Sequence, residues 1–244
     1  MRRAPLQRIA VVIPAHDEEE TIAACLAAVN QAARRAASMR YEAATYVVCD
    51  ACTDRTAQIV RDLGLVPLIV HERNVGAARA LGASAALRDG AEWLAFTDAD
   101  TLVAEDWLLA QLALASDVVC GTVTVDDWGG HDQAVREHFA ASYRDVDGHR
   151  HIHGANLGIS ADAYCRAGGF AMLTSSEDVA LVEALERAGV TIAWSAAPRV
   201  VTSARIDYRA PRGFGATLVA ACERLRMLPT IEPAELTSRQ FTFQ

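Results

Sequence analysis

The chain has 244 residues, 52% of them apolar, and carries a formal net charge of −8. This length and composition suit one globular α/β domain of the larger kind. The acidic balance, with no basic cluster longer than Arg34–Arg35, argues against nucleic acid as a partner. No stretch approaches the roughly 18–20 apolar residues of a membrane span, and the N-terminus is not a secretory signal, so we expect a cytoplasmic location.

The first half of the chain alternates strand and helix signals. Apolar runs predict strands at Ile9–Ile13, where Pro14 stops the run, and at Tyr46–Cys49, Val66–Val70 and Trp93–Phe96. Helical spacing of apolar residues predicts helices at Thr21–Ala37, Thr53–Leu63 and Val75–Leu87. This alternation indicates a mostly parallel sheet with helices on both faces, and ligands of such sheets bind at the carboxyl ends of the strands.

The second half of the chain is less regular. Strand signals cover Asp117–Val125, Ile152–Ser160, Thr191–Trp194 and Val200–Ser203, and helix signals cover Ala104–Leu114, His131–Tyr143 and Ser176–Ala188. Further on, Phe214, Leu218, Cys222 and Leu225 recur at helical spacing. We expect this last helix to pack on the domain, with membrane-surface contact or homodimer formation as the alternatives.

The segment Glu92–Thr101 leads a short apolar strand directly into two aspartates, Asp98 and Asp100. Alternate side chains of an extended backbone point the same way, so both carboxylates can bind one hard cation such as Mg²⁺ or Mn²⁺. Such an ion typically keeps positions open for phosphate oxygens, and the pattern therefore predicts a metal–diphosphate site. The alternative is that Asp100 or Thr101 caps the helix predicted at Ala104–Leu114.

Cysteine and histidine spacings are less informative. Cys49 and Cys52 form a single CxxC without a second one, which disfavours a structural zinc site. Small apolar fillers at a strand end are the favoured interpretation of this pair, and a redox pair is the alternative. His149, His151 and His153 alternate through an extended segment, where we expect a substrate-lining loop, with zinc binding as the alternative.

Seven motifs occur along the chain in an order and spacing typical of one enzyme family. They are IPAHDEEETI (Ile13–Ile22), VVCDACTDRT (Val47–Thr56), NVGAARALG (Asn74–Gly82), FTDADT (Phe96–Thr101), GANLGI (Gly154–Ile159), GGF (Gly168–Phe170) and EDVAL (Glu177–Leu181). Together they resemble family 2 glycosyltransferases of the GT-A fold. The resemblance implies metal-dependent transfer of a sugar from a nucleotide-diphosphate-sugar donor to an acceptor hydroxyl, with inversion.

Other functions remain open beside this resemblance. A nucleotidyltransferase on a similar sheet would normally have a Gly-rich, basic first loop, and a catalytically inactive nucleotide- or glycan-binding module would lack the acidic residues found here. The first strand is not followed by G-x-G-x-x-G, which argues against a dinucleotide-dependent oxidoreductase.

The resemblance also implies a domain organisation. We expect one GT-A domain over residues 1–228, with a nucleotide-binding half at about 9–101 and an acceptor and catalytic half at about 102–205. A C-terminal helix at about 213–228 and a polar tail at 229–244 complete the chain.

The resemblance further implies roles for individual residues. The donor-binding set is Pro14, Ala15, His16, Glu18, Asp50, Arg79 and Asp98; the metal ligands are Asp100 and Asp98; the sugar or acceptor set is His153, Gly154, Asn156 and Glu177; and the catalytic base is Asp178. Many relatives supply a further metal ligand, often a histidine, near the end of the domain. Residues 200–205 contain no histidine, so Thr202, Ser203, Arg205 or water would have to compensate.

Several of these residues have structural alternatives. Asp17 and the acidic residues after it would cap the first helix, and Asp54 would cap the next helix. Arg79 would lie on a solvated helix face. Asp178 would serve only as a capping carboxylate at the start of its helix.

Overall fold

The computed structural model describes residues 8–205 together with Val219. Its elements are β1 (Arg8–Ala15), α1 (Ile22–Ser38), β2 (Glu42–Asp50), α2 (Thr56–Asp62), β3 (Leu68–Val70), α3 (Val75–Arg88), β4 (Trp93–Phe96), β5 (Leu102–Val103), α4 (Trp107–Ala113), β6 (Val118–Gly121), α5 (Gln133–Ser142), the 3₁₀ turn η1 (Gly154–Asn156), β7 (Leu157–Ser160), α6 (Ala161–Arg166), α7 (Glu177–Arg187), β8 (Ile192–Ser195) and β9 (Val200–Val201). Apart from Val219, the expected C-terminal helix and polar tail lie outside the described residues, as do the membrane or dimer contacts assigned to that helix.

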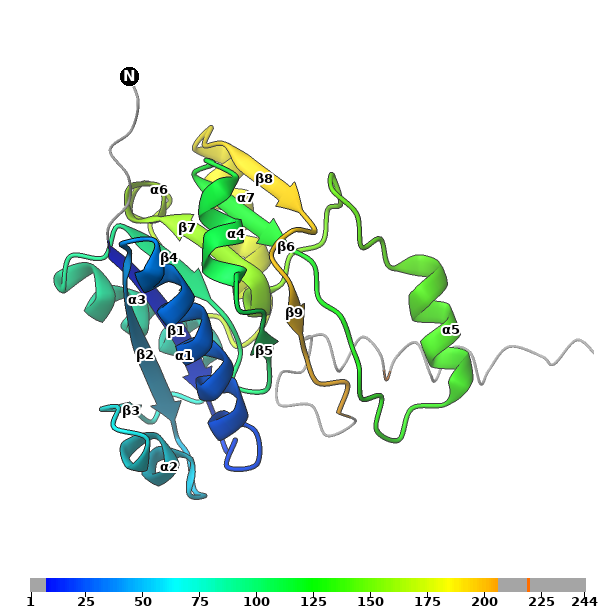
Figure 1. Ribbon diagram of the computed structural model, residues 1–244, viewed down its shortest axis with the longest axis horizontal. Helices are drawn as coiled ribbons and strands as arrows, with labels where there is room; N and C mark the ends of the chain where they lie inside the picture. The colour runs from blue at the N-terminus through cyan, green and yellow to red at the C-terminus, as the bar shows by residue number, and fades with distance from the viewer. Residues whose placement is uncertain (1–7, 206–218, 220–244) are drawn as a thin grey trace, which may run out of the picture.

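The main sheet confirms the α/β class expected from the sequence. Its seven strands have the order β3-β2-β1-β4-β7-β6-β8 (Figure 1). Most neighbouring pairs are parallel, and β7 runs antiparallel to both β4 and β6. A small second sheet pairs β5 with β9, which brings the segment after the Asp98/Asp100 motif next to residues 200–201.

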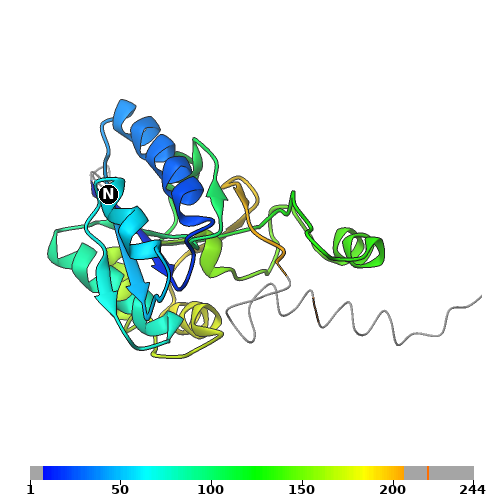
Figure 2. The same ribbon diagram turned by 90° about the horizontal axis from the view of Figure 1, so that it is seen from below.

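Helices cover both faces of the main sheet, because alternate strand residues are apolar on each side. On β1, Ile9, Val11 and Ile13 join the core beneath α1 and α4, whereas Ala10 and Val12 join the core beneath α3, α6 and α7. Figure 2 shows the blue helix α1 on one side of the sheet and the yellow helix α7 on the other. Both cores together fix the strand ends that carry the site.

We expected Pro14 to end the first strand. In the structure it lies within β1, opposite Val48 of β2. The carbonyl of Val12 accepts from the N–H of Thr97 on the β4 side. Two residues later, the backbone nitrogen of Pro14 points to the same side, beyond the last residue of β4 that pairs with β1. No ladder hydrogen bond is lost there, and the proline is tolerated.

Two predicted helix starts are wrong by three residues. The second helix begins at Thr56 rather than Thr53, and its N-cap residue is Arg55. Asp54, one residue earlier, accepts from the Thr56 N–H at 2.9 Å and so satisfies the first N–H of the helix. The fourth helix begins at Trp107 after Asp106, because the unpredicted strand β5 lies between it and the acidic motif. Neither Asp100 nor Thr101 can therefore cap α4.

The segment between β6 and β7 departs most from the compact sheet. Figure 1 shows α5 standing well away from the sheet, at the right of the view. Val135 of α5 is nevertheless buried, in a small cluster with Ala204. Among the described residues, no helix has both the length and the apolar character needed to cross a bilayer.

Candidate active site

Three neighbouring strands direct polar residues to one edge of the main sheet. β1 lies between β2 and β4 and is parallel to both, so the carboxyl ends of the three strands lie together. His16 and Glu18 follow β1, Asp50 ends β2, and Asp98 and Asp100 follow β4. The sequence prediction of a site at this edge agrees with the sheet order.

Arg79 lies at the centre of this site. Its side chain is buried and forms an ion pair with Glu177 of α7, and its Nη2 lies 2.5 Å from Asp98 Oδ1. Gly154 packs directly on the guanidinium, and a Cβ at this position would clash with it. Arg79 thus joins α3, the strand-end aspartate and the start of α7, and the alternative of a solvated helix face is wrong.

Asp178 lies in the first turn of α7, beside the same cluster. Its Oδ2 accepts from the backbone N–H of Gly154 at 2.8 Å, and its Oδ1 accepts from the N–H of Val179 at 2.8 Å. Ser176, the N-cap residue, has left-handed φ and makes no capping hydrogen bond with its side chain. The carboxylate therefore has a structural function at the helix start and, being only partly buried, also borders the site.

Arg205, the last residue of the continuous described segment, reaches the acidic residues of the site. Its guanidinium donates to both carboxylate oxygens of Glu18, at 2.7 and 2.5 Å. It also lies 3.0 Å from Asp100 Oδ2. Arg205 was one of several residues that we considered as substitutes for the missing histidine, and the geometry favours it because the guanidinium reaches Asp100 directly.

Asp100 has an unusual electrostatic environment. Burial raises its pKa to about 7, although the Arg205 guanidinium opposes the shift. The carboxylates of Asp98 and Glu18 raise the pKa of Asp100 further, because they repel its charged form. The carboxylates of Glu18, Asp98 and Asp100 thus lie near one another at a partly desolvated site.

The residues at this place fit a divalent cation. Carboxylate oxygens are the donors that Mg²⁺ and Mn²⁺ prefer, and a cation would relieve the mutual repulsion of Asp98 and Asp100. In residues 8–205, no third histidine, cysteine, aspartate or glutamate groups with them closely enough to complete a three-residue protein site. Water and phosphate oxygens would therefore have to supply the other positions.

Asp50 is buried and acts on the backbone. Its Oδ1 accepts from the N–H groups of Glu72 and Arg73 at 2.7 and 2.9 Å, and its Oδ2 accepts from that of Asn74 at 2.7 Å. The Asp50 carbonyl also accepts from Nδ1 of His16 at 2.6 Å. Asp50 therefore holds the loop before α3 and the turn after β1, and its carboxylate oxygens are already engaged.

Asn156 is fully buried and connects three segments. Its Oδ1 accepts from Nε1 of Trp107 at 2.9 Å, and its Nδ2 donates to the carbonyls of Thr122 and Pro198 at 2.7 and 2.9 Å. We expected this amide to contact substrate hydroxyls from the GANLGI motif. The structure places it in the protein interior, where it supports the backbone beneath Gly154.

The three alternating histidines each have partners within the protein. His153 Nε2 lies 2.9 Å from the Tyr143 hydroxyl, and the ring of His151 stacks on Tyr143 with centroids 4.0 Å apart. Burial lowers the pKa of His153 to about 3, so the ring is neutral at physiological pH. Within residues 8–205 the histidines form no metal-binding group. Tyr143, which the sequence suggested only as a helix end, thus contacts the segment that leads to Gly154.

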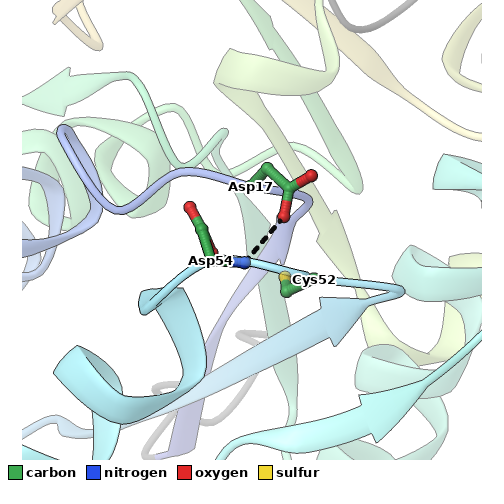
Figure 3. Close-up of side chains that lie close together, drawn as sticks. All are labelled: Asp17, Cys52 and Asp54. Carbon is green, nitrogen blue, oxygen red and sulfur yellow. Dashed lines mark hydrogen bonds between the residues drawn. The ribbon is translucent and has the colours of Figure 1, made fainter.

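A second acidic group lies where the turn after β1 meets the loop after β2. Asp17, Cys52 and Asp54 have potential ligand atoms within 4.8 Å of one another (Figure 3). Asp17 Oδ1 accepts from the N–H groups of Thr53 and Asp54 at 2.6 and 3.3 Å, and Asp54 Oδ2 accepts from Glu19 N–H at 2.9 Å. These bonds join two loops, and they show that Asp17 does not cap α1, whose N-cap is Thr21.

Comparison with known structures identifies the same fold in proteins whose structures contain UDP. The UDP complex of S. aureus TarS residues 1–349 has a TM-score of 0.60 at 14% identity, covering 80% of this chain and 60% of that one. Glucosyl-3-phosphoglycerate synthase from Mycobacterium tuberculosis, with Mg²⁺ and UDP, has a TM-score of 0.59 at 17% identity, covering 89% and 80%. GalNAc-T7 with UDP, GalNAc and Mn²⁺ has a TM-score of 0.59 at 15% identity, covering 81% and 44%.

The chain is shorter than the first of these structures, of which it spans 60%. No curated protein matches its sequence. The model of one family, described as glycosyl transferase family 2, matches residues 10–174, which include the Asp98/Asp100 motif, Arg79 and the loop at Gly154. That match covers more than half of the chain, and the chain therefore belongs to the family 2 glycosyltransferases.

Proposed function

We propose that the chain transfers a sugar from a nucleotide-diphosphate-sugar donor to an acceptor hydroxyl, with a divalent ion and with inversion at the anomeric carbon. The observation that carries the proposal is the position of Arg79 between Asp98 and Glu177. This arrangement connects the strand-end motif expected to bind the donor with the start of α7, where the expected base Asp178 lies. UDP in several structures of similar fold supports a nucleotide donor.

Donor binding would take place at the edge formed by β1, β2 and β4. The turn at residues 14–18 and the loop held by Asp50 would border the nucleotide, and Arg79 would hold Asp98 in place. A divalent ion bound by Asp100 and Asp98 would stabilise the charge that develops on the leaving diphosphate. Arg205, next to Asp100, would add a second positive charge there.

Asp178 would act as the general base. A carboxylate positioned beside the acceptor can take the proton of its attacking hydroxyl. Its hydrogen bond to the Gly154 N–H fixes its orientation relative to the buried cluster. His153, the residue before Gly154, would not take this proton instead, because burial lowers its pKa to about 3 and leaves the ring too weakly basic.

The first experiment measures nucleotide affinity by calorimetry with UDP and GDP, in Mn²⁺ and in EDTA. The preferred nucleotide should bind at least about tenfold more weakly in EDTA, and also when Asp100→Asn is tested in Mn²⁺. Glu105→Gln is the matched control, because Glu105 is an exposed acid in the following segment. Equal affinity under all these conditions would rule out the metal-dependent donor site.

The second experiment concerns Asp178. Asp178→Asn keeps the shape and an acceptor oxygen for the Gly154 N–H but removes basicity. Sugar transfer should fall by about 10²–10⁴-fold while nucleotide affinity stays near the wild-type value. NMR of the product should show inverted anomeric configuration. Near wild-type transfer by Asp178→Asn, or a product with retained configuration, would contradict this role. If the wild type binds nucleotide but transfers no sugar, the chain is a binding module.

A further inference from the structure

Cys49 and Cys52 form a thiol pair at the end of β2. Cys49 is fully buried and pairs with Ala15 in the sheet, whereas Cys52 is half-buried in the loop that follows. Between them Ala51 has φ of 51°, a left-handed conformation that turns the chain back. Both cysteines therefore lie at Ala15, with which Cys49 pairs in the sheet and to whose carbonyl the Cys52 thiol donates at 3.4 Å. Two cysteines placed beside the same residue need little movement to form a disulfide.

The two thiols differ in reactivity. The hydrogen bond from Cys49 lowers the pKa of Cys52 to about 7, although burial and the carboxylates of Asp54 and Asp17 oppose the shift. The same hydrogen bond, together with burial, raises the pKa of Cys49. A half-buried thiol that ionises near neutral pH is a good nucleophile, and a buried neighbour can resolve the product.

The pair also contacts the turn that we assign to the donor. The Cys52 thiol donates to the carbonyl of Ala15 at 3.4 Å, and Figure 3 shows Cys52 beside Asp17 of the same turn. Asp50, between the two cysteines, holds the loop at residues 72–74. A change in the conformation of the Cys49–Cys52 turn would therefore alter contacts with both the turn after β1 and the loop at residues 72–74.

We propose that Cys49 and Cys52 are a reversible thiol–disulfide site, whose oxidation by a small-molecule disulfide weakens nucleotide binding at the adjacent turn. In the first step the Cys52 thiolate attacks one sulfur of the external disulfide, forming a mixed disulfide and releasing one thiolate. In the second step Cys49, having lost its proton to solvent, attacks the Cys52 sulfur and expels the second thiolate. Two protein thiols are oxidised and one external disulfide is reduced to two thiols.

Oxidation forms a covalent S–S bond between the two cysteines, and it also removes a hydrogen bond. The disulfide carries no S–H, so the carbonyl of Ala15 loses the donor that the protonated Cys52 thiol supplies in the reduced protein. Loss of one such bond in the turn should weaken nucleotide binding about three- to tenfold. This second effect rests on the proposed donor site, whereas formation of the disulfide does not.

The experiment equilibrates the full chain with mixtures of reduced and oxidised glutathione at neutral pH, followed by acid quenching, alkylation and mass spectrometry. The wild type should lose two hydrogens, with the bond mapped to Cys49 and Cys52. Cys52→Ser should abolish this product, and Cys49→Ser should stop at a glutathione adduct on Cys52. Cys165→Ser, which changes an exposed cysteine in α6, is the control and should behave as wild type.

Calorimetry with UDP and GDP on the reduced and oxidised protein tests the coupling. Weaker binding by the oxidised wild type, reversed by dithiothreitol and absent in Cys52→Ser, supports the proposal. Absence of the Cys49–Cys52 product, or equal nucleotide affinity of the reduced and oxidised forms, overturns it. If the reduced protein binds neither nucleotide while the disulfide still forms, the proposed donor site fails and the thiol–disulfide chemistry stands.

Discussion

Arg79 is buried between two carboxylates, Asp98 and Glu177, that come from distant parts of the sequence. Burial of the Glu177 carboxylate is tolerable only because the guanidinium neutralises it. The planar, forked shape of arginine suits two partners at once, whereas a lysine ammonium does not. The charge, the shape and the position of this side chain therefore all contribute to stability.

Replacement of Arg79 should destabilise the fold as well as the site. In Arg79→Met, Glu177 would remain buried without a partner, and the free energy of unfolding should fall by about 3–5 kcal/mol. Urea denaturation measures this change, with Arg88→Met as the control because Arg88 is exposed on the same helix. The double variant Arg79→Met/Glu177→Gln should recover part of the loss; equal stability of Arg79→Met and wild type would disprove the pairing.

At the scale of secondary-structure elements, Asp50 connects β2 to the start of α3. Asp50→Asn keeps the shape but leaves one acceptor oxygen for three backbone N–H groups. Hydrogen exchange at residues 72–74 should become about tenfold faster or more, since a lost bond to a charged group costs roughly 1.5–3 kcal/mol. Asp106→Asn, at the N-cap of α4, should leave these residues unchanged. Unaltered exchange in Asp50→Asn would show that the loop is held by other contacts.

The strands that carry the site were predictable because each is a continuous apolar run ending in polar residues. Trp93–Phe96 was predicted with its observed bounds, and the acidic motif after it lies where expected. The short pairing of β5 with β9 was missed, since it joins segments about a hundred residues apart and two-residue strands carry no periodicity. Residue type also left the role of Asn156 open, because an amide suits a substrate and a buried network equally well.

At the scale of the whole molecule, Asn156 connects α4, the end of β6 and the segment before β9. Its three hydrogen bonds are all buried, so Asn156→Ala leaves the Trp107 N–H and two carbonyls without partners. The free energy of unfolding should fall by about 2–5 kcal/mol, measured by urea denaturation. Asn30→Ala, on the exposed side of α1, is the control. A loss below about 1 kcal/mol would mean that water replaces the missing amide.

The pair between Glu18 and Arg205 spans 187 residues of sequence. During synthesis at about 5–20 residues per second, Glu18 is made about 10–40 s before Arg205. For that interval Glu18 and Asp100 lack the Arg205 guanidinium that pairs with them in the finished protein. A nascent or truncated chain would thus carry a mutually repelling acidic cluster, so completion of the active site is tied to completion of translation through residue 205.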